Sequence, residues 1–301
     1  MSKIEKNTNI SIILPLFNNN DSTLHTINSI LKQSFKNFEL IIVDNSTDEQ
    51  TQNIITTKTN EDCRIKYIKN KKDKTTASAL KQGISHANSK YISIMEENCT
   101  LSEEKLKVQF EYLTKNQDIA LIGTFVSSSN KQDEIIYNDP ERCSYEQIKF
   151  WINFYNPICT SSIMFNKEIV NEYNIIYQDS LPYAFDYYFI QELITNDLKI
   201  EIIPKKLTNI EFINKQENTE IFKKLKKITN REIQYGLLKR FYENNDEFFY
   251  VKKLLNDFPF GNYDKDKVKE ALNNLKIKNK NLNILNEEHL NTIFTHPTLL
   301  H

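Results

Sequence analysis

Polar side chains gather in the turns that follow apolar segments in the N-terminal part of the chain. After residues 10–14 the chain reads Pro15-Leu16-Phe17-Asn18, and after residues 39–43 it reads Asp44-Asn45-Ser46. A carboxylate such as Asp44 can accept hydrogen bonds from a base N–H or from ribose hydroxyls, and Phe17 offers an apolar wall for a ring. Asn and Asp also favour ordinary turns, so each turn alone fits both a binding role and a purely structural one.

A third turn, Glu96-Glu97-Asn98, follows the apolar segment 91–95. Acidic oxygens at the C-terminal end of a central strand suit a hard divalent cation held against a diphosphate. The cluster is a weak one, because Asn98 contributes no charge. The structural alternative is a pair of exposed glutamates ahead of a helix, and the motif alone does not separate the two interpretations.

An alternation of short apolar segments with amphipathic stretches must position these turns. Apolar segments that are flanked by helical patterns predict buried strands, and Asp44 and Glu96 each follow one of them directly. Such strands indicate an α/β fold with a mostly parallel sheet that helices cover on both faces. Ligands of such sheets bind at the C-terminal ends of the strands. The predicted strands span residues 10–14, 39–43, 64–68, 91–95, 119–126 and 161–165, and the predicted helices 22–32, 48–58, 77–87, 102–116 and 186–195.

Composition excludes several classes of protein. With 39 Lys and Arg against 40 Asp and Glu, the net charge is −1, so no global field gathers nucleic acid. No apolar run approaches the roughly 20 residues that span a bilayer, and the N-terminus lacks the apolar core of a signal peptide, which predicts a cytoplasmic protein. Only 4 glycines are present, and neither a dinucleotide-binding nor a P-loop glycine motif can be written. The 4 cysteines are far apart and form no CxxC pair, which argues against a zinc site or a disulfide framework.

Taken in order, the turns and their flanking segments resemble glycosyltransferase family 2. The resemblance is carried by Ser11–Asn18 (SIILPLFN), Ser29–Asp44 (SILKQSFKNFELIIVD) and Ala79–Ile84 (ALKQGI), and it continues through Asn156–Lys167. It implies a GT-A fold that binds a nucleoside-diphosphate sugar. We therefore predict a glycosyltransferase domain over residues 1–215 and a helical C-terminal extension over residues 216–301.

The resemblance also implies roles for individual residues. Asp186, in Tyr183-Ala184-Phe185-Asp186-Tyr187, falls on the Asp of the family's A-E-D-Y motif, which takes the proton of the acceptor hydroxyl as the sugar inverts. The alternative is that Asp186 caps the helix that follows it. For the nucleotide sugar, the implied ligands are Pro15, Phe17, Asn18, Asp44, Asn45, Ala79, Lys81 and Glu96, and for a divalent metal, Mn²⁺ or Mg²⁺, they are Glu96 and Asn98.

Three departures from the family pattern bear on activity. The family's D-x-D motif reads Glu96-Glu97-Asn98 here, so a metal should bind weakly or not at all; Phe185 replaces the acidic partner of the base; and the family's R-x-H is absent near residues 209–214. One hypothesis is an inverting glycosyltransferase that uses a UDP-sugar and a glycan or lipid-linked acceptor in surface polysaccharide synthesis. The other is a catalytically weak or inactive relative that binds a nucleotide, a sugar or a protein partner.

Two further segments have both a functional and a plain interpretation. The predicted helix Phe222–Arg231 carries a basic face that could touch the inner membrane surface, where a lipid-linked acceptor would lie, although such faces are usually only solvated. Phe150, Trp151 and Phe154 stand at helical spacing, which is more typical of a core than of a sugar-stacking platform. The sequence carries no indication of an oligomeric state.

Overall fold

The computed structural model describes residues 8–17, 20–70, 75–128, 137–153, 155–178, 180, 184–210, 273 and 277. The chain forms two compact units, residues 1–143 with 158–216 and residues 144–157 with 217–301. The predicted helical extension, with the basic segment Phe222–Arg231, lies outside the described residues except for positions 273 and 277. The boundary at residue 215 therefore stays a prediction.

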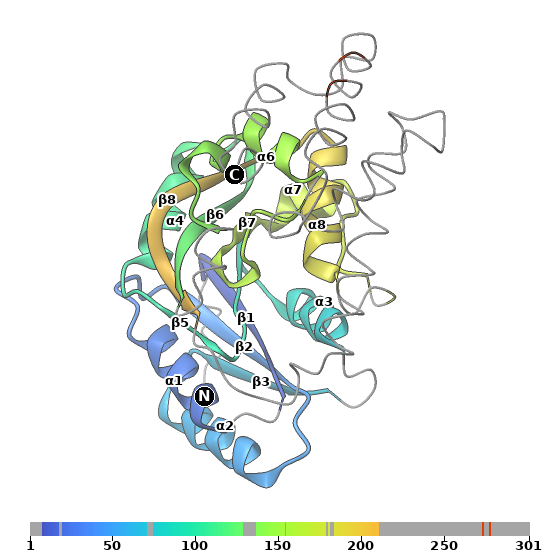
Figure 1. The fold of residues 1–301 in the computed structure, drawn as a ribbon. Helices are drawn as coiled ribbons and strands as arrows, with labels where there is room; N and C mark the ends of the chain where they lie inside the picture. Colours follow the sequence, from blue (N-terminus) through green and yellow to red (C-terminus); the bar gives the residue numbers. More distant parts are fainter. Residues whose placement is uncertain are drawn as a thin grey trace, which may run out of the picture. The chain divides into compact units, whose positions relative to one another are not determined.

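The first unit follows the predicted alternation of strands and helices, and each predicted strand and helix is present within a few residues of its expected bounds (Figure 1). Two additional strands, Cys99–Leu101 and Lys199–Ile210, and a short helix, Lys167–Glu172, complete it. In chain order the elements of this unit are β1 (Ile10–Leu16), α1 (Asn20–Leu31), β2 (Phe38–Asp44), α2 (Glu49–Glu61), β3 (Ile65–Lys69), α3 (Thr76–His86), β4 (Tyr91–Ile94), β5 (Cys99–Leu101), α4 (Lys105–Lys115), β6 (Ile119–Ser128), η1 (Pro140–Arg142), η2 (Thr160–Ser162), β7 (Met164–Asn166), α7 (Lys167–Glu172), α8 (Phe185–Thr195) and β8 (Lys199–Ile210).

The strands form one 8-stranded sheet in the order β3-β2-β1-β4-β7-β6-β8-β5. Parallel pairing joins β1 to β2 and β4, β2 to β3, and β6 to β8. The three remaining pairings, which involve β7 and β5, are antiparallel. An α/β fold with a mostly parallel sheet flanked by helices is thereby confirmed.

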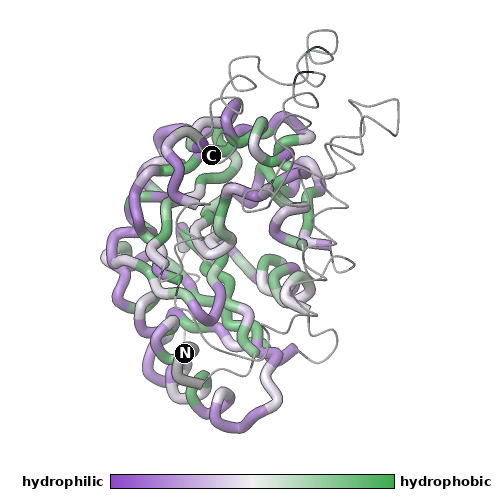
Figure 2. Tube along the Cα trace, in the orientation of Figure 1, coloured by the Kyte–Doolittle hydropathy of each residue, from purple (hydrophilic) through white to green (hydrophobic). Residues whose placement is uncertain are grey.

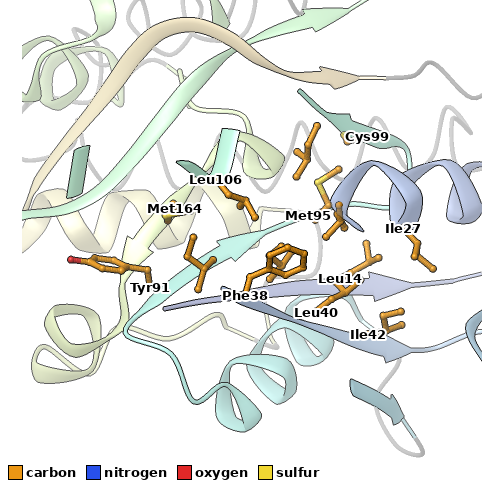
Figure 3. Packing of buried hydrophobic residues seen from close by; sticks show 14 of the residues in the cluster. Leu14, Ile27, Phe38, Leu40, Ile42, Tyr91, Met95, Cys99, Leu106 and Met164 are labelled. Carbon is orange, nitrogen blue, oxygen red and sulfur yellow. The ribbon is translucent and has the colours of Figure 1, made fainter. Parts of the chain in front are cut away.

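Both faces of the β1–β2 pair are covered, as the mostly apolar sequence of these strands predicts. Leu14 and Ile42 lie with Ile27 of α1 in the main hydrophobic cluster (Figure 3). Successive side chains of a strand point to opposite faces, and Ile13 and Val43 accordingly contact α3 on the other face. In Figure 2 the hydrophobic residues concentrate along the central strands, while the outer turns of α1 and α2 are hydrophilic.

Gly83 allows α3 to approach the sheet closely. A Cβ atom added at this position would lie 2.4 Å from Cγ2 of Ile13 and 3.2 Å from Cγ2 of Val43. Real Cβ atoms do not come that near, so a larger side chain would push α3 away from β1 and β2. The glycine thus fixes how near α3 lies to the ends of these two strands.

Two predictions on chemistry outside the site can be compared directly with the structure. All four cysteines are free thiols. Among the residues that the structure describes, no helix is both long enough and apolar enough to cross a bilayer.

In the second unit, α6 (Tyr145–Trp151) packs Phe150 edge-on against Trp151, with ring centroids 5.3 Å apart, and both residues are buried. Phe154 lies outside the described residues.

Candidate active site

The acidic turn Glu96–Asn98 connects β4 to β5, and the backbone N–H of Cys99 closes it on the carbonyl of Glu96 at 3.2 Å. Its two glutamates are half-buried. The carboxylate of Glu97 accepts a hydrogen bond from the backbone N–H of Phe17 at 2.8 Å, which ties this turn to the end of β1. The alternative of two exposed glutamates ahead of a helix is therefore wrong. Three-residue β5 escaped sequence analysis and separates the turn from α4.

Ser161 holds Glu96 in place. Its hydroxyl donates to Oε2 of Glu96 at 3.1 Å and accepts from the backbone N–H of the same residue, also at 3.1 Å. Ser161 and its neighbours were predicted to begin a strand, but residues 160–162 form the short η2 turn and β7 starts at Met164. The turn is anchored by Gln109, whose Nε2 donates to the carbonyl of Ser162 at 2.8 Å.

Asp186 lies in the first turn of α8, next to the same η2 segment. The hydroxyl of Thr160 donates to Oδ2 of Asp186 at 3.3 Å, while the adjacent Ser161 binds Glu96. Two carboxylates that are 90 positions apart in the sequence are thus brought together on neighbouring residues of one turn. The N-cap of α8 is Ala184, with no side-chain cap hydrogen bond, so the alternative that Asp186 caps this helix is wrong.

Asp44, at the end of β2, is fully buried and has partners on both carboxylate oxygens. Oδ1 accepts from the backbone N–H of Ser46 at 2.7 Å, and Oδ2 accepts from the hydroxyl of Tyr67 at 2.8 Å and from Nζ of Lys69 at 2.9 Å. Burial by itself would raise the pKa of Asp44, but the hydrogen bonds from Lys69, Ser46 and Tyr67 outweigh it and lower the pKa. Burial and the bond to Asp44 raise the pKa of Tyr67 to about 12.

The residues predicted to contact the nucleotide are gathered at the adjoining ends of β1 and β2. Leu16 and Asp44 are register partners, and the backbone N–H of Asn45 donates to the carbonyl of Leu16 at 2.8 Å. Pro15 precedes this pair inside β1, and Phe17 follows it with its N–H on Glu97. The side-chain oxygen of Asn45 accepts from Asn70 at 2.8 Å. Asn18 lies outside the described residues.

Ala79 and Lys81 lie on α3 but do not share a face. Ala79 is fully buried, whereas Lys81 is exposed, as expected for two residues about 200° apart around a helix. Ala79 can therefore support a ligand only through the packing of α3 on β1 and β2. Lys81 is charged and exposed, so of the two residues it is the one that could contact a ligand directly.

A buried lysine lies behind the acidic turn, and sequence analysis missed it. Lys105, the first residue of α4, is fully buried, and its Nζ donates to Oγ of Ser93 on β4 at 3.2 Å. Burial lowers the pKa of Lys105 to about 7, against the opposing influence of the thiols of Cys159 and Cys99. A lysine at the start of a helix would ordinarily be exposed, so the sequence carried no signal for it.

The structure thus has polar turns at the C-terminal ends of parallel strands and two carboxylates that face one turn. Residues 11–173 match the family model described as "Glycosyl transferase family 2". The chain belongs to glycosyl transferase family 2. It is a glycosyltransferase, and the resemblance seen in its sequence is confirmed.

Two curated relatives show the range of the similarity. An uncharacterized glycosyltransferase of Methanocaldococcus jannaschii is 27% identical over 242 residues, which cover 79% of this glycosyltransferase and 81% of the relative. The Escherichia coli UDP-Glc:alpha-D-GlcNAc-diphosphoundecaprenol beta-1,3-glucosyltransferase WfgD is 24% identical over 139 residues. That match covers 46% of this chain and 54% of WfgD, so it spans about half of the relative's length.

Two solved structures share the fold. Staphylococcus aureus TarS 1–349 in complex with UDP-GlcNAc superposes with a TM-score of 0.60 at 15% identity, covering 91% of this glycosyltransferase and 83% of that chain. The mannosyltransferase PcManGT of Pyrobaculum calidifontis, in complex with GDP-Man and Mn²⁺, has a TM-score of 0.62 at 11% identity, with coverage of 88% and 74%. At these identities the likeness establishes the GT-A fold alone.

The donor set of the glycosyltransferase suits a divalent metal only in part. Glu96 and Asn98 supply oxygen atoms, which Mg²⁺ and Mn²⁺ prefer. Within the described ranges, however, no three His, Cys, Asp or Glu side chains come together in a way that would hold a metal ion. Ions of this type are commonly bound by one or two carboxylates together with substrate phosphates and water. The residues present fit such a shared site, with the phosphates supplying most of the ligands.

Proposed function

We propose that this glycosyltransferase transfers a sugar from a nucleoside-diphosphate sugar to an acceptor hydroxyl, with inversion at the anomeric carbon. The observation that carries the proposal is the convergence of Glu96 and Asp186 on Ser161 and Thr160, beside the polar turns of β1 and β2. One carboxylate lies at the strand end where the diphosphate of a GT-A donor would bind. The other lies on a separate helix and is proposed to reach the acceptor hydroxyl, as a general base must.

Asp186 is the proposed general base. It is half-buried at the start of α8, and the described residues offer it one hydrogen bond, the 3.3 Å contact from Thr160, which engages Oδ2. No described residue binds Oδ1, and we assign this oxygen to the acceptor hydroxyl. In the reaction, the acceptor proton passes to this carboxylate as the acceptor oxygen bonds to the anomeric carbon. The bond between that carbon and the diphosphate oxygen breaks at the same time, and the nucleoside diphosphate leaves on the side opposite to the acceptor.

The nucleoside is assigned to the adjoining ends of β1 and β2, with Phe17 as the wall for the base. Because the Asp44 carboxylate is buried and already bonded, it acts in this proposal by fixing the turn Asp44–Ser46 and the ammonium of Lys69. Glu96 and Asn98 would hold the metal. When bound, a divalent ion neutralises charge on the departing diphosphate.

UDP-sugars are the favoured donors, and a glycan or a lipid-linked sugar is the favoured acceptor, in surface polysaccharide synthesis. Support comes from the names of two similar proteins, the UDP-GlcNAc complex of TarS and WfgD, whose named acceptor is a diphosphoundecaprenol. Action at the inner face of a membrane follows from a lipid-linked acceptor. The basic segment Phe222–Arg231 would supply peripheral contact.

The test is a transfer assay with the purified chain. UDP- and GDP-sugars are offered with polyprenyl-diphosphate-linked and free glycan acceptors, and the anomeric configuration of the product is read by NMR. We expect UDP release that depends on the acceptor, together with a product whose anomeric configuration is opposite to that of the donor. Retained configuration would overturn the inverting mechanism. Nucleotide binding without transfer across the whole panel would favour the hypothesis of an inactive binding protein.

A further inference from the structure

Tyr177 lies between α7 and α8 and is held rigidly among aromatic rings. Its ring stacks on Phe189 of α8, with centroids 4.4 Å apart and planes 10° from parallel. It also meets the edge of Phe185, one turn earlier on the same helix, at 5.9 Å. With 1% of its surface exposed, the side chain cannot swing to solvent without breaking both contacts.

The hydroxyl of Tyr177 has no hydrogen-bond partner among the residues that the structure describes, although the atom is buried. A buried hydroxyl left without a partner destabilises a protein, whereas phenylalanine would fill the same space without that penalty. The ring contacts therefore account for an aromatic residue at this position but not for its oxygen. A group of this kind is explained when a partner is acquired in another state of the protein.

Two observations point to the partner: the rings that hold Tyr177 belong to α8, which also carries Asp186, and nearby carboxylates act on the hydroxyl. Burial chiefly, and the carboxylates of Asp186 and Glu96 in addition, raise the pKa of Tyr177 well above its usual value. The hydroxyl thus stays protonated, and these two carboxylates are the candidates to accept a hydrogen bond from it. Ser161 already forms two hydrogen bonds with Glu96, whereas the hydrogen bond from Thr160 to Asp186 is long, at 3.3 Å. Asp186 is therefore the favoured acceptor for the Tyr177 hydroxyl.

We propose that Tyr177 is a positioning residue, whose hydroxyl donates a hydrogen bond to Asp186 when donor and acceptor are bound and so aims the free oxygen of Asp186 at the acceptor. The inference rests on the proposed function, because Asp186 is the base in that reaction. Asp186 stands between Phe185 and Phe189 on α8, so the two rings that clamp Tyr177 belong to the helix that carries the base.

Phe185 supports this role. The family resemblance places an acidic residue there, as the partner of the base, and this chain has a ring that packs against Tyr177 instead. An acid at position 185 would repel Asp186, whereas a protonated phenol held by Phe185 supplies a donor. A hydrogen bond from Tyr177 therefore substitutes for the missing acidic partner in fixing the orientation of the base.

Tyr177→Phe removes the oxygen and keeps the ring. We expect kcat to fall by about tenfold or more, as for the loss of a hydrogen bond to a charged group, with donor KM within about twofold of the parent. The melting temperature should stay the same or rise. Tyr91→Phe is the matched control, because Tyr91 is also buried but lies at the other end of β4 from the acidic turn, and its hydroxyl points away from it (Figure 3). Its kcat should not change.

A double variant separates positioning from packing. In the Asp186→Asn background, Tyr177→Phe should have no further effect on kcat, because its target is already lost. A Tyr177→Phe variant that equals an active parent, or a loss of kcat that accompanies a lower melting temperature, would overturn the positioning role and leave the proposed function intact. A parent that transfers no sugar would instead contradict the proposed function, and this role with it.

Discussion

Asp44 and Asp186 lie in the same sheet unit but are bonded in opposite ways. Asp44 is fully buried, and Ser46, Tyr67 and Lys69 satisfy it without any ligand. Asp186 is half-buried, and among the described residues it has one long hydrogen bond, from Thr160, and an electrostatic influence on Tyr177, whose hydroxyl has no partner there. The turn that we assign to the nucleotide is therefore preorganised by the protein, whereas the proposed base has hydrogen bonds left for substrates to complete.

Substituting Asp44 should have the largest effect on stability. Asp44→Ala removes the partner of Lys69, whose side chain is 33% exposed, so we expect a loss of about 3 kcal/mol in the free energy of unfolding, at the low end for a broken buried pair. It should also abolish stabilisation of the chain by UDP, because the turn Asp44–Ser46 loses its internal anchor. Chemical denaturation and thermal shift with UDP measure both effects.

The matched control is Asp118→Ala. Asp118 pairs with Lys199 at 2.6 Å, but both side chains are more than half exposed, so this change should leave stability and UDP binding nearly unaltered. The pKa of Asp44 is lowered in the folded protein, so its stabilisation is present above the unfolded value near 4 and is lost as the pH falls through the folded pKa. The difference between parent and Asp44→Ala should shrink in acid. If Asp44→Ala and Asp118→Ala lowered the free energy of unfolding equally at neutral pH, the buried bonds of Asp44 would not preorganise its turn, and the contrast with Asp186 would fail.

Lys105 sharpens the comparison, because among the described residues this buried charge has no close counter-ion of the kind that Asp44 has in Lys69. Its pKa is lowered to about 7, so the penalty of burying the charge is complete below that pH. The penalty diminishes as the pH rises from about 7 toward the unfolded value near 10.4. Lys105→Met should therefore stabilise the chain at pH 6.5 by about 2 kcal/mol, and by less at pH 9.

Lys107→Met, on the exposed face of the same helix, controls for removal of a positive charge and should change little at either pH. Urea denaturation at the two pH values measures the effect. If Lys105→Met is destabilising at pH 6.5, the buried ammonium is held by stronger partners than Ser93. The region of the acidic turn Glu96–Asn98 would then be held by interactions within the protein as completely as the turn of Asp44 is.

The response to manganese should be the smallest of these effects. Glu96 is the one charged ligand proposed for the metal, so Mn²⁺ should improve the affinity for a UDP-sugar by less than about tenfold, or about 1.4 kcal/mol. Glu96→Gln should remove that difference, whereas Glu97→Gln, which alters a contact to the Phe17 backbone, should not. Titration calorimetry with and without Mn²⁺ provides the measurement. A stoichiometric, submicromolar requirement for Mn²⁺ would show that further residues complete the metal site.

Most of the sheet could be predicted because β1, β2 and β4 are short, mostly apolar strands that end in polar turns. β8 escaped because its sequence contains Pro204 and lysines at positions 199, 205 and 206. Its register with β6 shifts between Thr124, which pairs with Ile203, and Phe125, which pairs with Lys206, so the irregular stretch accommodates the proline. Periodicity carries no signal for a strand interrupted in this way.

The site could be predicted as far as motifs reach. Resemblance pointed to Asp44, Glu96 and Asp186, and the structure brings the last two together. Thr160 and Ser161 were missed as site residues because their role depends on a tight turn in place of the first residues of the predicted strand. Tyr177 was missed because its proposed role rests on an oxygen that has no partner among the described residues, which only the packing around it reveals.

Asp186→Asn tests the central claim most directly, because Asn preserves the size of the side chain and Ala184, not Asp186, occupies the N-cap. In the transfer assay, the parent should form product, while the variant should lose about 10²–10⁴-fold in kcat with donor affinity nearly unchanged. Full transfer activity in Asp186→Asn would contradict the assignment of the base, and with it the account of this edge of the sheet as an inverting catalytic site.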